Sequence, residues 1–278
     1  MMIISSICFS IIAALIKFLK DIPLVEIIFF RNLFLVIFIS YAIKKERISF
    51  LGKDNFWLSI RCIFAFLAVW GHTYAIRTML ITNAVTIKQL VPFFIVIIAK
   101  IILKERIPKK QIPIFIVAFF GVLLLTKPGI NLNLFPTLIG ITSAILEATA
   151  HTALRQLRIS DHPLVIVFYY GAFSVLIALV ILIFGNIYVI PNFLDSMILL
   201  SIGLLNLISQ ITLTRAYKLA PASLVSQYMY SQIVFAFIFG IIFFKEAPDL
   251  LSSIGSIIII LSGYFNYKVK LDTSGIIK

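Results

Sequence analysis

An acidic residue and a histidine lie four positions apart inside a strongly apolar segment of this sequence. Glu147 and His151 fall in the run 134–154, and Glu147 lies about 16 Å along a helix that begins near Pro136. A carboxylate at that depth is costly in a lipid bilayer and needs a partner. The two side chains share one helix face. They could bind a cationic group or pass a proton, or they could form a structural pair with Arg31 or a hydroxyl group.

Four cations interrupt the apolar runs, namely Arg31, Arg61, Lys88 and Lys100. Lys88 and Gln89 precede Pro92, whose ring leaves the carbonyl of Lys88 without its helical partner. We therefore expect a kinked, polar segment that faces a cavity, with both residues as candidates for a binding site. Arg31 is a candidate for an ion pair or for binding an anionic substrate group. Arg61 lies near the start of its run, so we expect its side chain to snorkel to the cytoplasmic interface.

Uncharged polar residues follow helix periodicity in two later runs. Asn206 and Gln210 share one stripe, and Gln227 and Tyr230 share another. Such residues either line a substrate path or hold neighbouring helices together, and both interpretations stay open.

Aromatic residues cluster toward the end of the run 55–76. Tyr74 is typical of an aromatic belt at a membrane interface, and His72 could belong to the same belt, whereas Trp70 could stack on a planar or cationic ligand. No residue is predicted to be catalytic or to bind a metal. The candidate substrate-binding residues are Glu147, His151, Arg31, Lys88, Gln89, Trp70, Asn206, Gln210, Gln227 and Tyr230.

The composition identifies an integral membrane protein. Of 278 residues, 62% are hydrophobic and 13% are charged, whereas soluble domains are about half apolar and about a quarter charged. The net charge of +13 comes from short basic clusters between apolar runs, as in cytoplasmic loops, so nucleic-acid binding is not expected. The two cysteines show no disulfide or metal-ligand spacing.

The elements that must position these residues are membrane-spanning helices. We predict an all-α integral membrane fold of about ten spans. The first run, before Lys17, is short for the roughly 20 residues that a span requires. The others lie at about 24–43, 55–76, 81–103, 111–126, 134–154, 163–184, 196–214, 220–244 and 248–267.

The sequence also repeats itself. DIPLVEIIFF at 21–30 returns as DHPLVIVFYY at 161–170, and the polar run 81–108 returns at 220–249. Five spans per repeat is an odd number, so the halves must be inverted in the membrane, which is a transporter architecture. We therefore predict a first five-helix repeat at 1–127, a second at 134–267 and a cytoplasmic tail at 268–278.

The 24 lysines and arginines predict the orientation of the chain. With the N-terminus inside, most basic residues of the loops fall on the inner side of the membrane. The positive-inside rule then favours a cytoplasmic location for both termini.

Several motifs carry a family resemblance. The paired exits ILKERIP and FFKEAPD, the arginine in FFRNLF and the run RAYKLAPASLVSQY resemble the EamA-type branch of the drug/metabolite transporter superfamily. This resemblance implies a ten-helix, inverted-repeat secondary transporter in the bacterial inner membrane. Members carry amino acids, nucleotide-like metabolites, sugars and drugs. VEIIFFRNLF and SLVSQYMYSQIV also resemble S-adenosylmethionine uptake transporters of intracellular bacteria.

We accordingly expect a secondary transporter that moves a small polar or amphipathic metabolite by alternating access. The expected substrates are amino-acid-like or nucleoside-like compounds, a class to which S-adenosylmethionine belongs. No P-loop is present to indicate direct use of ATP. The alternatives are an exporter of the same fold, a membrane-embedded lipid-group transferase, which would need clustered carboxylates, and a membrane scaffold. We expect no enzymatic activity and no cofactor. The expected partners are the substrate and the lipid bilayer, and a homodimer is compatible with the sequence.

Overall fold

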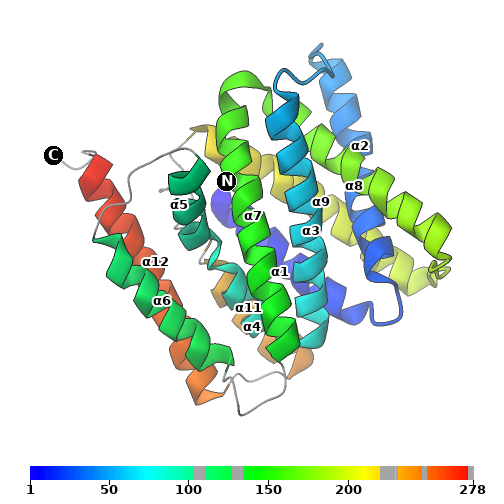
Figure 1. The fold of residues 1–278 in the computed structure, drawn as a ribbon. Coiled ribbons are helices and arrows are strands. Elements are labelled where there is room, and N and C mark those ends of the chain that lie inside the picture. The colour runs from blue at the N-terminus through cyan, green and yellow to red at the C-terminus, as the bar shows by residue number, and fades with distance from the viewer. Residues whose placement is uncertain (103–109, 127–133, 220–228, 230, 246–248, 275–278) are drawn as a thin grey trace.

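The computed structural model describes residues 1–102, 110–126, 134–219, 229, 231–245 and 249–274, and all regular structure in this part of the chain is helical (Figure 1). The helices are α1 (Met2–Phe18), α2 (Leu24–Lys45), α3 (Asn55–Thr78), α4 (Ile81–Lys88), α5 (Val91–Ile102), α6 (Gln111–Thr126), α7 (Leu134–Ser160), α8 (Pro163–Gly185), α9 (Phe193–Leu219), α11 (Ser231–Phe244) and α12 (Leu250–Ser274).

These helices confirm the all-α membrane fold. Five stretches are long and apolar enough to cross a bilayer, namely α2, α3, the α4–α5 segment, α8 and Phe193–Ala216 within α9. Four shorter apolar helices lie in α1, α6, α11 and α12. The remaining helix, α7, has 27 residues, about 40 Å at 1.5 Å per residue, which is enough to cross. The described residues therefore supply segments for each of the ten expected spans.

The predicted kink in the fourth span is confirmed. Helix α4 ends at Lys88 and α5 begins at Val91. Across the break the backbone makes short-range bonds, from Gln89 N to Thr86 O and from Leu90 N to Ile87 O, both 3.0 Å. Pro92 explains this geometry because it has no N–H for the carbonyl of Lys88. The break leaves polar residues in the interior of the bundle.

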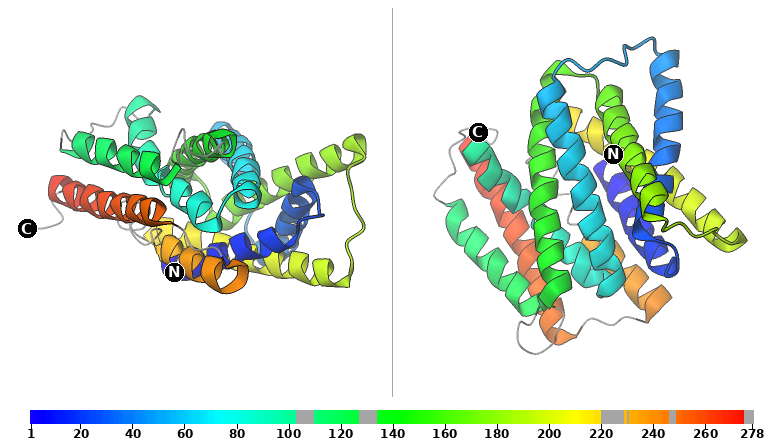
Figure 2. Two further views of the ribbon diagram at one scale, coloured as in Figure 1. Left: turned by 90° about the horizontal axis from the view of Figure 1, so that it is seen from below. Right: turned by 45° about the vertical axis from the view of Figure 1, so that its right-hand side comes forward.

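The packing of the helices follows the symmetry of two inverted repeats. Helix α3 packs along α7, and the repeat-related helices α1 and α9 pack in the same way. Likewise α5 packs on α7 and its counterpart α11 packs on α1. The pairs α2–α8 and α6–α12 each join a helix to its own repeat mate. Figure 2 shows α6 beside α12 at one end of the molecule in both views. Each of these helix pairs therefore has an equivalent pair, or is its own equivalent, when the two repeats are exchanged.

Small residues let the paired helices approach closely. A Cβ atom on Gly121 of α6 would lie 2.9 Å from Ile259 Cγ1 of α12, and one on Gly171 of α8 would lie 2.6 Å from Leu35 Cδ2 of α2. Both distances are too short for a real carbon–carbon contact. Close packing of this kind drives helix association in membranes, where the hydrophobic effect between helices is weak.

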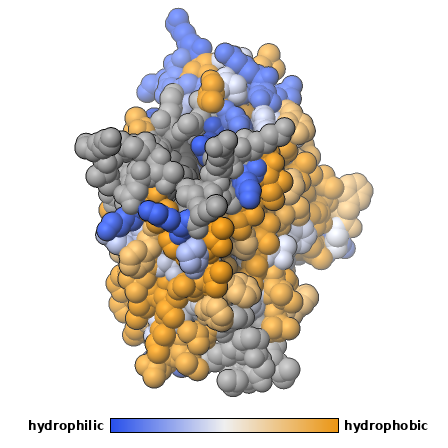
Figure 3. All heavy atoms as spheres, turned by 60° about the vertical axis from the view of Figure 1, so that its left-hand side comes forward, coloured by the Kyte–Doolittle hydropathy of each residue, from blue (hydrophilic) through white to orange (hydrophobic). Residues whose placement is uncertain are grey.

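The outer surface fits a lipid environment. Large apolar side chains are exposed on several helices, among them Phe120, Phe184 and Leu261. Figure 3 shows apolar residues over much of one face, with hydrophilic residues gathered toward one end. The protein is therefore a multi-pass membrane protein. Helix α12 continues to Ser274, beyond residue 267 where we placed the end of the second repeat.

Two buried carboxylates hold connecting segments at opposite ends of the α2–α8 pair. Asp161, just before α8, accepts a 2.7 Å bond from Lys53 N in the segment between α2 and α3. Glu26, in the first turn of α2, accepts a 3.1 Å bond from Val189 N in the segment between α8 and α9. Each repeat thus fastens a loop of the other.

Candidate functional site

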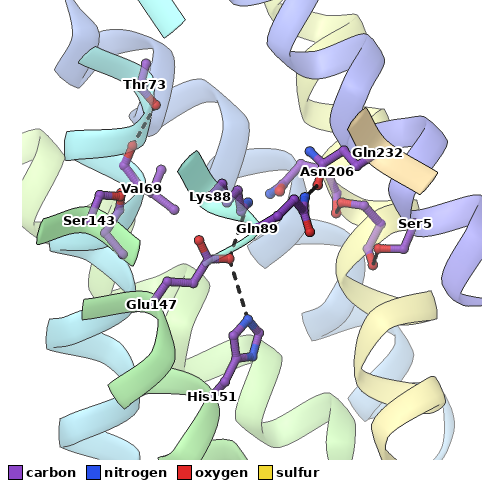
Figure 4. A network of polar contacts seen from close by, with 12 residues as sticks. Ser5, Val69, Thr73, Lys88, Gln89, Ser143, Glu147, His151, Asn206 and Gln232 are labelled. Atoms are coloured by element: carbon purple, nitrogen blue, oxygen red, sulfur yellow. Dashed lines mark hydrogen bonds and ion pairs between the residues drawn. The ribbon is translucent and has the colours of Figure 1, made fainter. Parts of the chain in front are cut away.

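The carboxylate of Glu147 lies at the centre of a charged cluster inside the bundle. Glu147 Oε1 is 3.2 Å from Lys88 Nζ and 3.5 Å from His151 Nε2 (Figure 4). The Glu147 and Lys88 side chains keep 18% and 10% of their surface accessible, whereas His151 keeps 2%. The ion pair is therefore largely desolvated but is not sealed off from a small solute.

Small residues on α7 bring Glu147 into the centre of the bundle. Ala144 and Ala148, on either side of it, are at most 1% exposed. Ser143 Oγ donates a 2.6 Å bond to the carbonyl of Ala68 in α3, which fixes α7 against that helix. Helix α7 also packs on α4 and α5. The carboxylate consequently points toward the broken span rather than toward lipid.

The break between α4 and α5 presents the complementary groups. Lys88 is the last residue of α4, so its ammonium extends from a helix end toward Glu147. Gln89 is fully buried and donates from Nε2 to Gln232 Oε1 of α11 at 3.4 Å. The predicted polar lining at this kink is therefore present, with Gln232 as a member.

A second polar contact lies between α2 and α9. Arg31 Nε donates a 2.9 Å bond to Asn206 Oδ1, and Asn206 Nδ2 donates a 3.1 Å bond to the carbonyl of Arg31. The ring of Phe9 in α1 connects this contact to the first cluster. Lys88 Nζ lies 5.0 Å from the ring centroid and Arg31 Cζ lies 6.0 Å from it. Arg31 and Lys88 are thus two cations that contact the same aromatic ring.

The structure corrects two expectations about cations. Glu147 pairs with Lys88 and not with Arg31. The predicted snorkelling of Arg61 is wrong because this residue is 5% exposed and its guanidinium lies 5.4 Å from the ring centroid of Tyr170. A buried aromatic ring offers the cation a partner inside the bundle, which removes the need to reach the interface.

The aromatic residues of α3 have different surroundings. Trp70 packs with an apolar cluster around Val25, Ala178 and Leu182, and its stacking on a ligand stays a prediction. His72, for which an interfacial belt was one possibility, lies within electrostatic range of Lys88, Glu147 and Arg31. The structure thus adds His72 to the candidate site.

Other sequence candidates lie at the edge of the site or beyond the described part. Gln210, one turn after Asn206 in α9, is 5% exposed, and its Oε1 has no hydrogen-bond partner among the described residues. Gln227 and Tyr230 lie outside the described residues, as do the exit residues Glu105 and Glu246. Phe9 was missed, since a phenylalanine in an apolar run gives no signal of its own.

The chemistry of this site is ion pairing and hydrogen bonding. It offers a carboxylate, two cations, two histidines and amides in a desolvated space, where such contacts are strong. Among the residues that the structure describes, no group of three or more His, Cys, Asp or Glu side chains could hold a metal ion. The arrangement is suited to recognition of a small polar molecule.

The chain is similar to known transporters over most of its length. The model of the EamA-like transporter family matches residues 1–127 and 134–267. The pseudopaline exporter CntI of Pseudomonas aeruginosa is 30% identical, with 94% of this chain and 92% of the relative covered. The S-adenosylmethionine uptake transporter of Rickettsia prowazekii is 22% identical, with 86% and 81% covered.

A solved crystal structure supports the fold. It aligns with a TM-score of 0.68 over 94% of each chain at 14% sequence identity. Identity this low carries the architecture only. The family model matches both halves of the sequence, and the bundle has the expected inverted-repeat packing. The chain belongs to the EamA-like transporter family.

Proposed function

We propose that this protein is a secondary transporter that moves a small polar or amphipathic metabolite across the bacterial inner membrane by alternating access. The substrate is amino-acid-like or nucleoside-like, a class that includes S-adenosylmethionine, and an exporter of the same fold is the alternative. Both termini are proposed to lie in the cytoplasm. The relatives support transport in either direction, because one is named as an exporter and one as an uptake transporter.

One observation carries this proposal: three central polar contacts join one repeat to the other. Lys88 of α4 pairs with Glu147 of α7. In the same way Gln89, just after α4, bonds a residue of α11, and Arg31 of α2 bonds Asn206 of α9. Sequence repeats that meet at a polar midplane site are the architecture of alternating access. A substrate that competes for these groups would change how the halves are held together.

The substrate site we assign consists of Glu147, Lys88, His151, Arg31, Gln89 and Asn206. A lipid-group transferase needs clustered carboxylates, whereas among the described residues Glu147 is the one carboxylate in the interior of a helix away from both ends. A scaffold does not need a partly accessible ion pair at this depth. Both alternatives are therefore less consistent with the geometry than transport is.

The test is transport by purified protein in liposomes. Labelled amino acids, nucleosides and S-adenosylmethionine are offered from outside, and exchange is measured with preloaded vesicles. We expect at least one compound to be moved, with transport lost in Glu147→Gln. Glu46→Gln is the matched control, because Glu46 is an exposed residue at the end of α2. Transport by Glu147→Gln at the wild-type rate, or movement of no compound in the set, would refute the proposal.

A further inference from the structure

The buried centre of the bundle has an excess of positive charge. Arg31 is 6% exposed and the Lys88 side chain is 10% exposed. In the described part of the chain, Glu147 is the carboxylate that faces them, while Glu26 and Asp161 lie at helix ends on loop amides. Uncompensated charge in a low-dielectric interior is unfavourable. The site therefore favours a ligand that supplies negative charge.

Arg31 is the cation whose binding capacity is least used. Its Nε bonds Asn206, and within the described residues its two terminal nitrogens have no hydrogen-bond partner and no carboxylate lies within ion-pair distance. Lys88, by contrast, already pairs with Glu147. Both cations lie within 6.0 Å of the Phe9 ring centroid, so the same ring borders both.

The geometry points to a carboxylate. We propose that Arg31, with Lys88, binds the carboxylate of the transported substrate, and that the substrates are small carboxylates and amino acids. This inference rests on the proposed transport function. A planar guanidinium offers two parallel N–H donors that match a carboxylate. One negative charge balances one guanidinium, whereas a doubly charged phosphate monoester would add repulsion with Glu147.

The same site can take an ammonium group at its other end. Glu147 holds Lys88 Nζ at 3.2 Å, and a substrate ammonium could replace that nitrogen while Lys88 turns to the incoming carboxylate. A zwitterion would thus exchange partners with the resident ion pair, and charge would be conserved. A cation without an acid group would leave Arg31 unbalanced and would add a positive charge. Discrimination against cations therefore follows from the fixed charges.

The experiment measures thermal unfolding of the full-length protein in detergent with defined probes. The probes are glutamate, succinate, alanine, glycerol 3-phosphate and choline, each titrated at constant ionic strength. We expect glutamate, alanine or succinate to raise the unfolding temperature, and choline to leave it unchanged. Arg31→Gln should weaken the binding of the stabilising probe by at least about ten-fold, because a charge-assisted hydrogen bond is removed.

Two further variants keep the test decisive. Arg31→Lys retains the charge without the planar fork, so we expect intermediate affinity. Lys17→Gln removes a positive charge at a different place, where Lys17 Nζ donates to the carbonyl of Met79. This variant should leave the stabilisation by carboxylate probes intact. The inference is overturned by stabilisation with choline alone, by a phosphate preference, by no response to any probe, or by an unchanged carboxylate response in Arg31→Gln. If liposomes then transport a cation, the proposed transport function stands and the carboxylate-binding inference fails. If a carboxylate binds but is not transported, the binding site stands and the transport function fails.

Discussion

Replacing Glu147 with Gln should strongly destabilise the protein, because the change leaves the ammonium of Lys88 buried without its counter-ion. The 3.2 Å separation corresponds to an attraction of about 5 kcal/mol at an effective dielectric constant of about 20. Desolvation of both ions offsets much of that attraction in the intact pair, but loss of one partner costs about 3–5 kcal/mol. We expect Glu147→Gln and Lys88→Met each to lower the free energy of unfolding by about that amount.

The double variant distinguishes an ion pair from two independent contributions. In Lys88→Met with Glu147→Gln, both charges are absent and neither is left unpaired, so much of the lost stability should return. The sum of the two single losses should therefore exceed the loss in the double variant by at least about 2 kcal/mol. Transport should stay abolished in the double variant, since its fold is restored without the groups that bind substrate.

The assay is reversible unfolding in mixed micelles, read by tryptophan fluorescence. Glu46→Gln makes the same chemical change at an exposed helix end and should shift the free energy of unfolding by no more than about 0.5 kcal/mol. Additive losses in the double variant would refute the ion pair as a coupled unit. A loss below about 1 kcal/mol in Glu147→Gln would refute the statement that the pair is desolvated.

Three other substitutions test the scaffold around the site. Asn206→Leu removes the acceptor of a buried guanidinium and should lower the free energy of unfolding by about 1–3 kcal/mol, and an unchanged value would contradict the hydrogen bond. Gly171→Val inserts methyl groups where even a Cβ would lie only 2.6 Å from Leu35 Cδ2. We therefore expect the free energy of unfolding to fall by about 1–3 kcal/mol and the yield of folded protein in size-exclusion chromatography to fall with it. A normal yield and stability would show that the helices can separate. Asp161→Asn weakens the acceptor of Lys53 N and should speed hydrogen exchange of that amide, measured by mass spectrometry, whereas unchanged exchange would exclude a role in holding the loop.

The spans and the broken helix could be predicted because their causes are local in the sequence. An apolar run of sufficient length specifies a spanning helix wherever it occurs. Pro92 interrupts the hydrogen bonds of its own helix, so the end of α4 at Lys88 follows from a few consecutive residues. The sequence repeat further predicts that equivalent helices of the two halves make equivalent contacts. The matched packing of α1 with α9 and of α3 with α7 agrees with this prediction.

The partners inside the site could not be predicted, because they depend on the register between helices that are far apart in the sequence. Arg31 or a hydroxyl group was the expected structural partner of Glu147, but the packing of α7 against α4 brings Lys88 to it. Arg61 was assigned by its distance from a helix start, yet the nearby ring of Tyr170 holds it inside. Phe9 contributes to the site only through its position beside the two cations, and its residue type gave no sign of that role in the sequence.

In the proposed transport cycle, three contacts at the centre link substrate recognition to movement because they cross between the repeats. Glu147 is in the second half and its partner Lys88 is in the first, and Arg31 and Asn206 are divided in the same way. The proposed rocking of one half against the other would lengthen these bonds, at a cost that grows as the ions separate in a medium of low dielectric constant. In the proposed binding mode, a ligand that supplies both a carboxylate and an ammonium would satisfy the same groups and replace the direct bond between Lys88 and Glu147.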